Sequence, residues 1–316
     1  MGGLAGKLVR LVAVLFAISV LTFLLTQLLP GDPACQLLGP QCGDKAAVAR
    51  VEKDLELDKP LPTQYTHWVG GVLHGDFGRA YSSNQDVSQI IEQRFPVTLE
   101  LLILAQLFAL AIAVPVAIYS AYRRDGWFDR TVTTLSFASL SIPQFVLAVV
   151  LVYVLAVKFN VFPATGLTHL SDDLVLNLKS MFLPSLSLAL GIAAVYVRLL
   201  RSDMITTLQE DYILMARAEG LPPRRILLRH ALRPSSFSLL TVAGINVGAL
   251  IGGAVIIEYL FALPGLGSKL VESIFRRDYL VVQGIVLLVA AGYVLVNFAV
   301  DALYSALDPR TRHASA

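Results

Sequence analysis

The chain has 316 residues, of which 56% are hydrophobic and 15% are charged. Soluble domains contain about 45–50% apolar and about 25% charged residues, so this composition excludes an ordinary soluble domain and predicts an all-α integral membrane protein. The length accommodates about six helical spans of roughly 20 residues each. A formal net charge of +2 gives no indication of nucleic-acid binding.

The first apolar segment covers residues 11–29 and follows the basic residues Lys7 and Arg10. It is longer than the apolar region of a secretory signal, and no small-residue cleavage pattern lies close behind it. We therefore expect residues 1–29 to form a retained transmembrane helix whose N-terminus is cytoplasmic.

Residues 30–96 are polar and carry Gly, Pro and mixed charge. Apolar residues at helical spacing within 45–57, and again from Trp68 to Leu73, predict short helices. Because the segment is too long for a bare turn, we expect a small folded extracytoplasmic cap.

Both cysteines of the chain, Cys35 and Cys42, lie in this cap. Their short separation on an oxidising face favours a disulfide, and two free thiols are the alternative. His67 and His74 are not at a recognised ligand spacing from them, so we predict no metal site.

Five more apolar segments follow within a core of residues 97–305, before a short cytoplasmic tail of residues 306–316. The segments are residues 97–122, 132–157, 181–200, 237–261 and 281–303. Basic residues concentrate on one side of the resulting six-span arrangement, notably in the turn after the second span and between the fourth and fifth spans. The positive-inside rule then places both termini in the cytoplasm.

The longest polar interval between spans contains a loop of residues 201–234 that is rich in arginine. Within it, apolar residues recur at helical spacing and predict one short helix with an apolar stripe: Met204, Leu208, Tyr212 and Met215. Gly220 predicts a helix stop, and Pro222-Pro223 suit the first turn of a second helix that Pro234 ends. Two interpretations remain open, a docking element and a solvated basic loop held by lipid headgroups.

Three glycines in the fifth span, Gly244, Gly248 and Gly252, are four residues apart. Such spacing forms a strip along which another helix can approach closely. The strip is consistent with packing against a partner subunit or a conduit, and equally with packing inside one bundle.

The chain lacks the sequence motifs of a catalyst. It contains no G-x-x-x-x-G-K-[ST] phosphate loop, no H-E-x-x-H and no G-x-S-x-G. We therefore predict no catalytic residue, no metal site and no nucleotide on this chain, so uphill transport needs energy from another chain. No carboxylate lies in the middle of a span, which disfavours an ion-coupled carrier.

Several motifs, occurring in order over nearly the whole chain, resemble the permease subunits (B type) of dipeptide/oligopeptide/nickel-type ABC importers. They are Leu29-Pro30-Gly31-Asp32-Pro33, Gly75-Asp76-Phe77-Gly78-Arg79, Arg94-Phe95-Pro96-Val97-Thr98-Leu99-Glu100, Asp211-Tyr212, Ala216-Arg217-Ala218-Glu219-Gly220, Pro264-Gly265-Leu266-Gly267, Arg277-Asp278-Tyr279 and Leu307-Asp308-Pro309-Arg310. The general importer pattern E-A-A-x-x-x-G is not complete here, because Leu214 and Met215 stand at its first two positions. Leu221-Pro222-Pro223 also differs from the more polar run common in this group.

The resemblance implies a type I ABC importer transmembrane fold with a cytoplasmic coupling helix between the fourth and fifth spans. The residues implied to contact an ATPase are Met204, Leu208, Asp211, Tyr212, Met215, Ala216, Arg217, Ala218, Glu219 and Gly220. The implied partners are a homologous permease subunit forming a heterodimer, two cytoplasmic ATPases or one fused pair that bind ATP and Mg²⁺, an extracytoplasmic substrate-binding protein, and membrane lipid. The implied location is the bacterial inner membrane, and the substrates are dipeptides or oligopeptides.

Other functions remain open at this point. The same architecture also imports nickel chelates, haem and other small solutes. Two further classes are a self-sufficient channel or ion-coupled carrier, which would transport alone, and a membrane anchor or receptor whose cap binds ligand without conduction.

Overall fold

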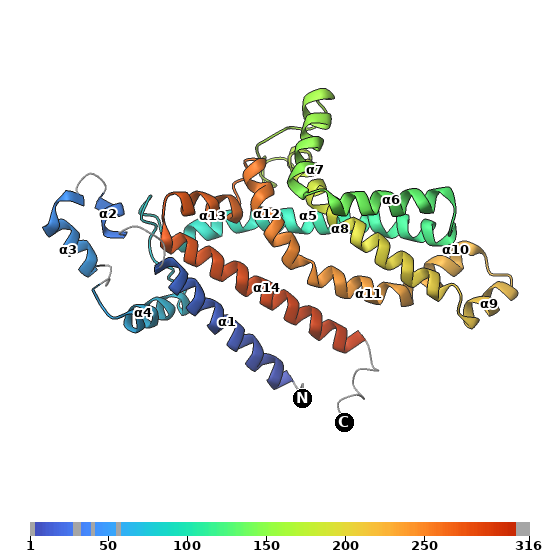
Figure 1. Cartoon of the computed structure of the whole chain (residues 1–316), viewed down its shortest axis with the longest axis horizontal. Helices are drawn as coiled ribbons and strands as arrows, with labels where there is room; N and C mark the ends of the chain where they lie inside the picture. Colours follow the sequence, from blue (N-terminus) through green and yellow to red (C-terminus); the bar gives the residue numbers. More distant parts are fainter. Residues whose placement is uncertain (1–3, 28–32, 39–41, 55–57, 308–316) are drawn as a thin grey trace. The chain divides into compact units, whose positions relative to one another are not determined.

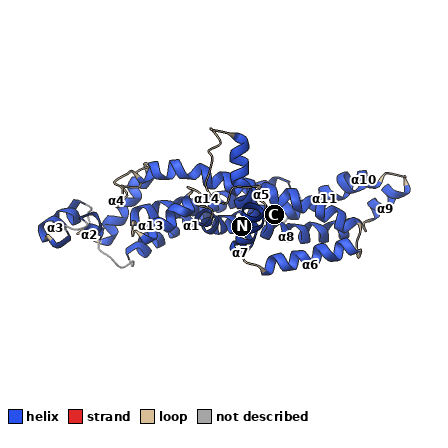
Figure 2. Ribbon diagram, turned by 90° about the horizontal axis from the view of Figure 1, so that it is seen from above, coloured by secondary structure: helices blue, strands red, loops and turns tan. Residues whose placement is uncertain are grey.

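A computed structural model describes residues 4–27, 33–38, 42–54 and 58–307. In this part of the chain the regular secondary structure is helical, apart from one bridge between Arg79 and Asp86 (Figure 2). The all-α prediction is therefore confirmed. Most of the predicted tail, including Arg310 and Arg312, lies outside the described residues.

The chain divides into two compact units. The first consists of Met1–Thr98 with Pro264–Ala316, and the second of Leu99–Leu263. The first boundary falls within one long helix, α5 (Val87–Tyr122).

The first unit pairs the initial and final apolar helices. Its elements are α1 (Leu4–Gln27), α2 (Pro33–Leu38), α3 (Lys45–Asp54), α4 (Leu61–Leu73), the start of α5, α13 (Leu266–Phe275) and α14 (Tyr279–Leu307). Helix α1 packs antiparallel along α14, so the start of α1 and the end of α14 lie at the same end of the pair (Figure 1).

The segment between α1 and α5 contains the helices predicted for it. Helix α4 lies against α1, where the Ser19 and Tyr65 hydroxyls are hydrogen-bonded at 2.8 Å and the Phe23 and Tyr65 rings meet edge to face. Cys35 of α2 forms a disulfide with Cys42. The pairing favoured by the sequence is therefore confirmed.

A buried carboxylate fastens the loop before α5 to the turn between α13 and α14. Asp278 is 1% exposed and accepts hydrogen bonds from the Tyr81 N–H at 3.1 Å and the Ser82 N–H at 3.0 Å. The Ser82 hydroxyl donates a third at 2.8 Å. Burial, and next the charge of Asp278, raise the pKa of Tyr81, so its hydroxyl stays protonated at neutral pH.

The second unit is built around α8 (Leu174–Thr207). Its other elements are the remainder of α5, α6 (Trp127–Ser141), α7 (Gln144–Leu151), the π-helical η2 (Val152–Lys158), α9 (Asp211–Ala218), α10 (Pro223–Arg225), the π-helical η3 (Ile226–Ala231), α11 (Leu232–Ile245) and α12 (Val247–Leu260). Helices α6, α7, α11 and α12 all contact α8. In the most apolar stretch of α8, 18 residues long, 72% of the residues are buried. Helix α8 is therefore the core of this unit.

The apolar helices are long enough to cross a membrane, but two of the predicted spans are bent. Single helices at Val87–Tyr122, Leu174–Thr207 and Tyr279–Val300 have the required length and apolarity, and α1 has a shorter apolar stretch, Leu11–Leu24. Two further spans are pairs of helices, α6 with α7–η2 bent by 107° and α10–α11 with α12 bent by 46°.

The apolar segment predicted over residues 132–157 is therefore bent rather than a single continuous helix, and Pro143 is the cause. A residue before proline is disfavoured in the α conformation. Ile142 is accordingly extended, with φ −98° and ψ 124°, and α7 starts again at Gln144.

The predicted glycine strip is divided by the second bend. Gly244 belongs to α11, while Gly248 and Gly252 belong to α12, beyond the break at Asn246. The close helix approach within this unit involves their neighbour Gly253 instead. A Cβ atom at Gly253 would overlap the Gln144 Oε1 atom and lie 3.0 Å from Leu188, and one at Gly191 would lie 3.3 Å from the Gln144 Nε2 atom. The Gln144 amide thus fits between glycines of α8 and α12.

We predict that Asp278→Ala destabilises the first unit by about 2 kcal/mol, because two partly buried N–H groups and one hydroxyl lose a charged acceptor. Thermal unfolding in detergent and proteolysis of the 75–86 loop measure the effect. Asp86→Asn is the matched control, since the Arg79–Asp86 ion pair is 68% and 44% exposed and contributes little. Equal melting temperatures for the two variants would contradict the prediction.

We predict that Gly253→Ala lowers the stability of the isolated chain by about 1–3 kcal/mol through overpacking against Gln144. Gly252→Ala is the matched control, because a Cβ atom there meets no atom within 4 Å. Thermal unfolding in detergent separates the two, and a Gly253→Ala midpoint as high as that of Gly252→Ala refutes this packing.

Candidate functional site

The candidate site is the loop of residues 201–234, which we call the basic segment. It begins in the last turns of α8, contains the short helix α9, and ends inside α11 (Figure 1). The single helix predicted through Met204 and Met215 is wrong. Helix α8 stops at Thr207, Glu210 is extended with φ −70° and ψ 148°, and α9 starts at Asp211.

Burial explains the break. Met204 is 0% exposed in the core around α8, but in α9 the buried residues are Ile213 (0%) and Ala216 (6%). A continuous helix would align Tyr212 and Met215 with Met204. The turn at 208–210 rotates α9 so that a different face is buried.

A small apolar cluster holds the basic segment together. Ile213 and Ala216 of α9 pack against Ile226 of η3, and Leu208 and Leu221 lie against them. An isolated helix of eight residues is unstable in water, so α9 depends on this cluster.

Gly220 ends α9 as predicted. Its φ of +76° is in the left-handed region, which glycine adopts without steric cost. The Gly220 N–H donates to the Arg217 carbonyl at 3.0 Å, and the Leu221 N–H donates to the Ala216 carbonyl at 3.2 Å. This pair of bonds is a Schellman motif, and it directs Leu221 back onto the cluster.

Pro234 does not end the second helix, which continues through α11 to Ile245. Inside an α-helix, a proline cannot donate a hydrogen bond to the carbonyl four residues earlier, and its ring clashes with that carbonyl. That carbonyl belongs to His230, in the wider π-helical turn η3, and it accepts a hydrogen bond from the Tyr212 hydroxyl at 3.4 Å. Burial, followed by the charge of Glu210, raises the pKa of Tyr212, so this hydroxyl stays protonated.

The outer face of α9 is apolar and exposed. Tyr212 is 46%, Leu214 51% and Met215 65% exposed. The other exposed residues predicted for the site lie around these three side chains. They are Asp211, Arg217, Ala218, Glu219 and Gly220. The basic segment therefore presents an apolar patch within a polar rim.

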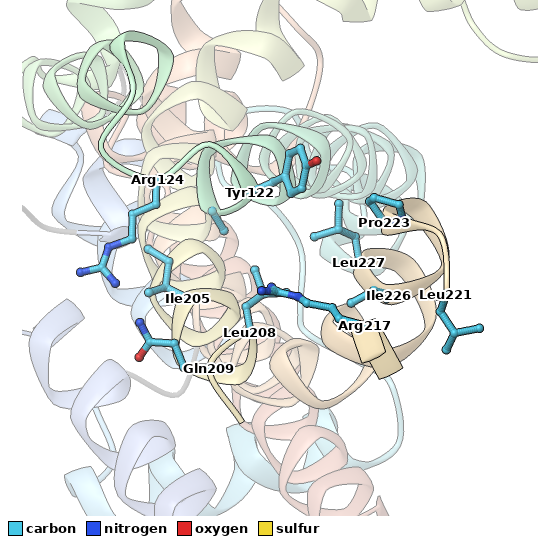
Figure 3. A pocket seen from close by; sticks show the side chains of 11 residues that line it. Tyr122, Arg124, Ile205, Leu208, Gln209, Arg217, Leu221, Pro223, Ile226 and Leu227 are labelled. Atoms are coloured by element: carbon cyan, nitrogen blue, oxygen red, sulfur yellow. The ribbon is translucent and has the colours of Figure 1, made fainter. Parts of the chain in front are cut away.

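A pocket of about 490 Å³ separates the end of α5 from the basic segment. Tyr122 lines it on one side, and Leu221, Ile226 and Leu227 on the other. Arg217 extends into the pocket toward Leu208 at the end of α8 (Figure 3).

Sequence reasoning missed the residues that position α9, namely Ile213, Leu221 and Ile226. The signal was the spacing of Ile213 and Ala216, which share a helix face at i and i+3. No group of three or more His, Cys, Asp or Glu residues in the described part of the chain is arranged to hold a metal ion.

Comparisons with known proteins identify the family of the chain. Residues 113–313 match the family described as the binding-protein-dependent transport system inner membrane component, and residues 4–102 match its N-terminal component. A glutathione transport system permease protein of Pectobacterium atrosepticum is 38% identical, over 97% of each chain. A probable peptide ABC transporter permease protein of Sinorhizobium fredii is 34% identical, over 97% of this chain and 98% of its own.

One solved structure supports the fold. A chain from inward-facing conformations of the MetNI methionine ABC transporter aligns with a TM-score of 0.58 and 19% sequence identity, over 70% of this chain and 97% of the other. The type I importer transmembrane fold is thus shown. Together these observations establish that the chain belongs to the family of binding-protein-dependent transport system inner membrane components, as an integral membrane permease subunit of an ABC importer.

Proposed function

We propose that this permease imports short peptides, with glutathione and dipeptides as the substrate class. The relatives that match it over nearly their whole length are named for glutathione and peptide transport. Both substrate kinds carry peptide bonds and charged termini.

Importers of this family work with an ATPase and a substrate-binding protein. We propose that this chain forms a heterodimer with a homologous permease. Two ATPases, separate or fused, bind ATP and Mg²⁺ below the membrane, and an extracytoplasmic protein delivers the peptide.

The observation that carries the coupling proposal is the two-faced helix α9. Its inner face, Ile213 and Ala216, is fixed by the cluster, and its outer face exposes Tyr212, Leu214 and Met215. A helix with an exposed apolar face fits a hydrophobic groove on a partner. The ATPase is the partner proposed for this face, and the exposed residues Asp211, Ala218, Glu219 and Gly220 form its rim.

The proposed orientation places the basic segment in the cytoplasm and the segment between α1 and α5 outside. Short arginine-rich loops support it, because they favour the cytoplasmic side. The basic residues Lys7 and Arg10 before the first span place the start of α1 on that side by the same rule, and the end of α14 lies at the same end of the helix pair (Figure 1). Both termini are then cytoplasmic, and the Cys35–Cys42 disulfide is in an oxidising compartment.

We propose that the partner permease packs against the exposed side of α12. Gly252 is exposed, with open space where a Cβ atom would be. It belongs with Gly248 to the small-residue strip that favours close approach of a helix from another subunit. Gly244, beyond the bend, extends the same contact along α11.

We predict that Met215→Glu weakens binding of the ATPase at least about tenfold, because a charge is buried in an apolar contact. Co-purification of the ATPase with the permease pair measures it. The matched control is Ile274→Glu in α13, where the native side chain is 49% exposed. If Met215→Glu retains the ATPase as fully as the control does, α9 is not the docking element.

We predict that vesicles containing the complete importer accumulate labelled dialanine or labelled glutathione when ATP is supplied. Unlabelled peptide should compete, whereas a nickel chelate or haem should not. Vesicles with the permease pair alone are the control and should accumulate nothing. Uptake without the ATPases would contradict the importer mechanism, and uptake of a nickel chelate or haem alone would contradict the peptide assignment.

A further inference from the structure

A buried ion pair joins three elements of the second unit near the basic segment. Asp129, in the first turn of α6, is 2% exposed. The Arg201 Nε and Nη2 atoms donate to its two carboxylate oxygens at 2.5 and 2.6 Å. Arg201 lies near the C-terminal end of α8, which leads directly into α9.

The same carboxylate also holds the turn between α5 and α6. The Ser120 hydroxyl, near the end of α5, donates to Asp129 Oδ1, and the Asp125 N–H donates to Oδ2 at 2.9 Å. Asp129 therefore accepts four hydrogen bonds from three residues, Ser120, Asp125 and Arg201. A planar guanidinium bound at both oxygens fixes relative orientation as well as distance.

Two cavities flank this ion pair. The pocket of about 490 Å³ lies between Tyr122 at the end of α5 and Leu227 of η3. A second cavity of about 220 Å³ lies between α6 and α8 and reaches from Leu140 to Arg201. The ion pair is thus a close polar connection between α6 and α8 beside these two cavities, in addition to the helix packing along their length.

The basic segment, in turn, is attached firmly to the end of α8. Leu208, at the end of α8, packs on the cluster of Ile213, Ala216 and Ile226. The Ser235 hydroxyl of α11 donates to the Thr207 hydroxyl at 3.0 Å. A displacement of α9 is thus passed to the C-terminal turns of α8, where Arg201 lies.

We propose that Asp129 and Arg201 are positioning residues of the transport cycle, forming a rigid joint that makes the α5–α6 turn and α6 follow the end of α8 when the ATPases move α9. This proposal rests on the proposed docking of α9. Helix α6 ends at the Ile142–Pro143 break, beyond which Gln144 lies between Gly191 and Gly253. The joint therefore links the cytoplasmic end of the unit to the middle of the bent span.

The test uses the complete importer with spin labels at Trp127→Cys (79% exposed) and Thr206→Cys (exposed), one at the start of α6 and one near the end of α8. In an otherwise native chain we expect a single narrow distance population, both without nucleotide and with trapped ATP. Asp129→Asn should broaden it and lower solute uptake per ATP hydrolysed by about tenfold. ATPase co-purification should stay unchanged.

Leu188→Ala is the matched control, since Leu188 is a 0% exposed residue of α8 outside the joint. It should lower thermal stability but keep the narrow distance and the native uptake per ATP. If Asp129→Asn does not insert, Arg201→Lys replaces it, because lysine keeps the charge but not the paired N–H fork.

Three results distinguish the explanations. A narrow distance and native coupling in Asp129→Asn or Arg201→Lys overturn the joint. Equal broadening and uncoupling in Leu188→Ala also overturn it, because the effect is then one of stability alone. The docking proposal is tested separately. If Met215→Glu retains the ATPase as fully as the joint variants do, the docking proposal is overturned instead.

Discussion

The absence of water in the bilayer core is the constraint on which this structure depends. Backbone N–H and C=O groups there must bond within a helix, and a broken helix is tolerated only where the break is buried in protein or lines a water-filled cavity. The second unit has two such breaks, at Ile142–Pro143 and at Asn246. Helix α8 lies against the elements on both sides of each break. Its Gly191 accommodates Gln144, and its Tyr196 is hydrogen-bonded to Gln106 at 3.1 Å.

The basic segment shows how a short helix is held in place by a small apolar cluster. Charge contributes little to holding α9, because its polar residues are exposed and screened by solvent. The cluster around Ile213, the Schellman motif at Gly220 and the Tyr212–His230 hydrogen bond hold it instead. The apolar outer face is therefore left free for a partner, while the inner face keeps the helix rigid. Burial on one side and exposure on the other are the features on which the proposed coupling role of α9 rests.

One buried carboxylate in each unit has a structural role, because it accepts hydrogen bonds from several segments of the chain. Asp278 gathers the backbone N–H groups of Tyr81 and Ser82. Asp129 gathers a guanidinium, a hydroxyl and a backbone N–H. Each ties together chain segments that are separated by a loop, because a carboxylate has several acceptor positions and a high cost if left unpaired. The permease thus uses buried charge to fix geometry, while energy for transport comes from its ATPase.

Hydropathy and charge alone determined the all-helical membrane class, and ordered motifs such as those at 216–220 and 264–267 indicated the family. Local chemistry also predicted the Gly220 stop and the Cys35–Cys42 disulfide. Only the tertiary structure decided which side of α9 is buried, because Ile213 and Met215 are equally apolar and differ only in what packs on them. It likewise decided that Gly253, rather than its neighbour Gly252, receives Gln144, and that Asp129 meets Arg201. Such pairings join residues far apart in the chain, and helical periodicity carries no information about which helix lies opposite.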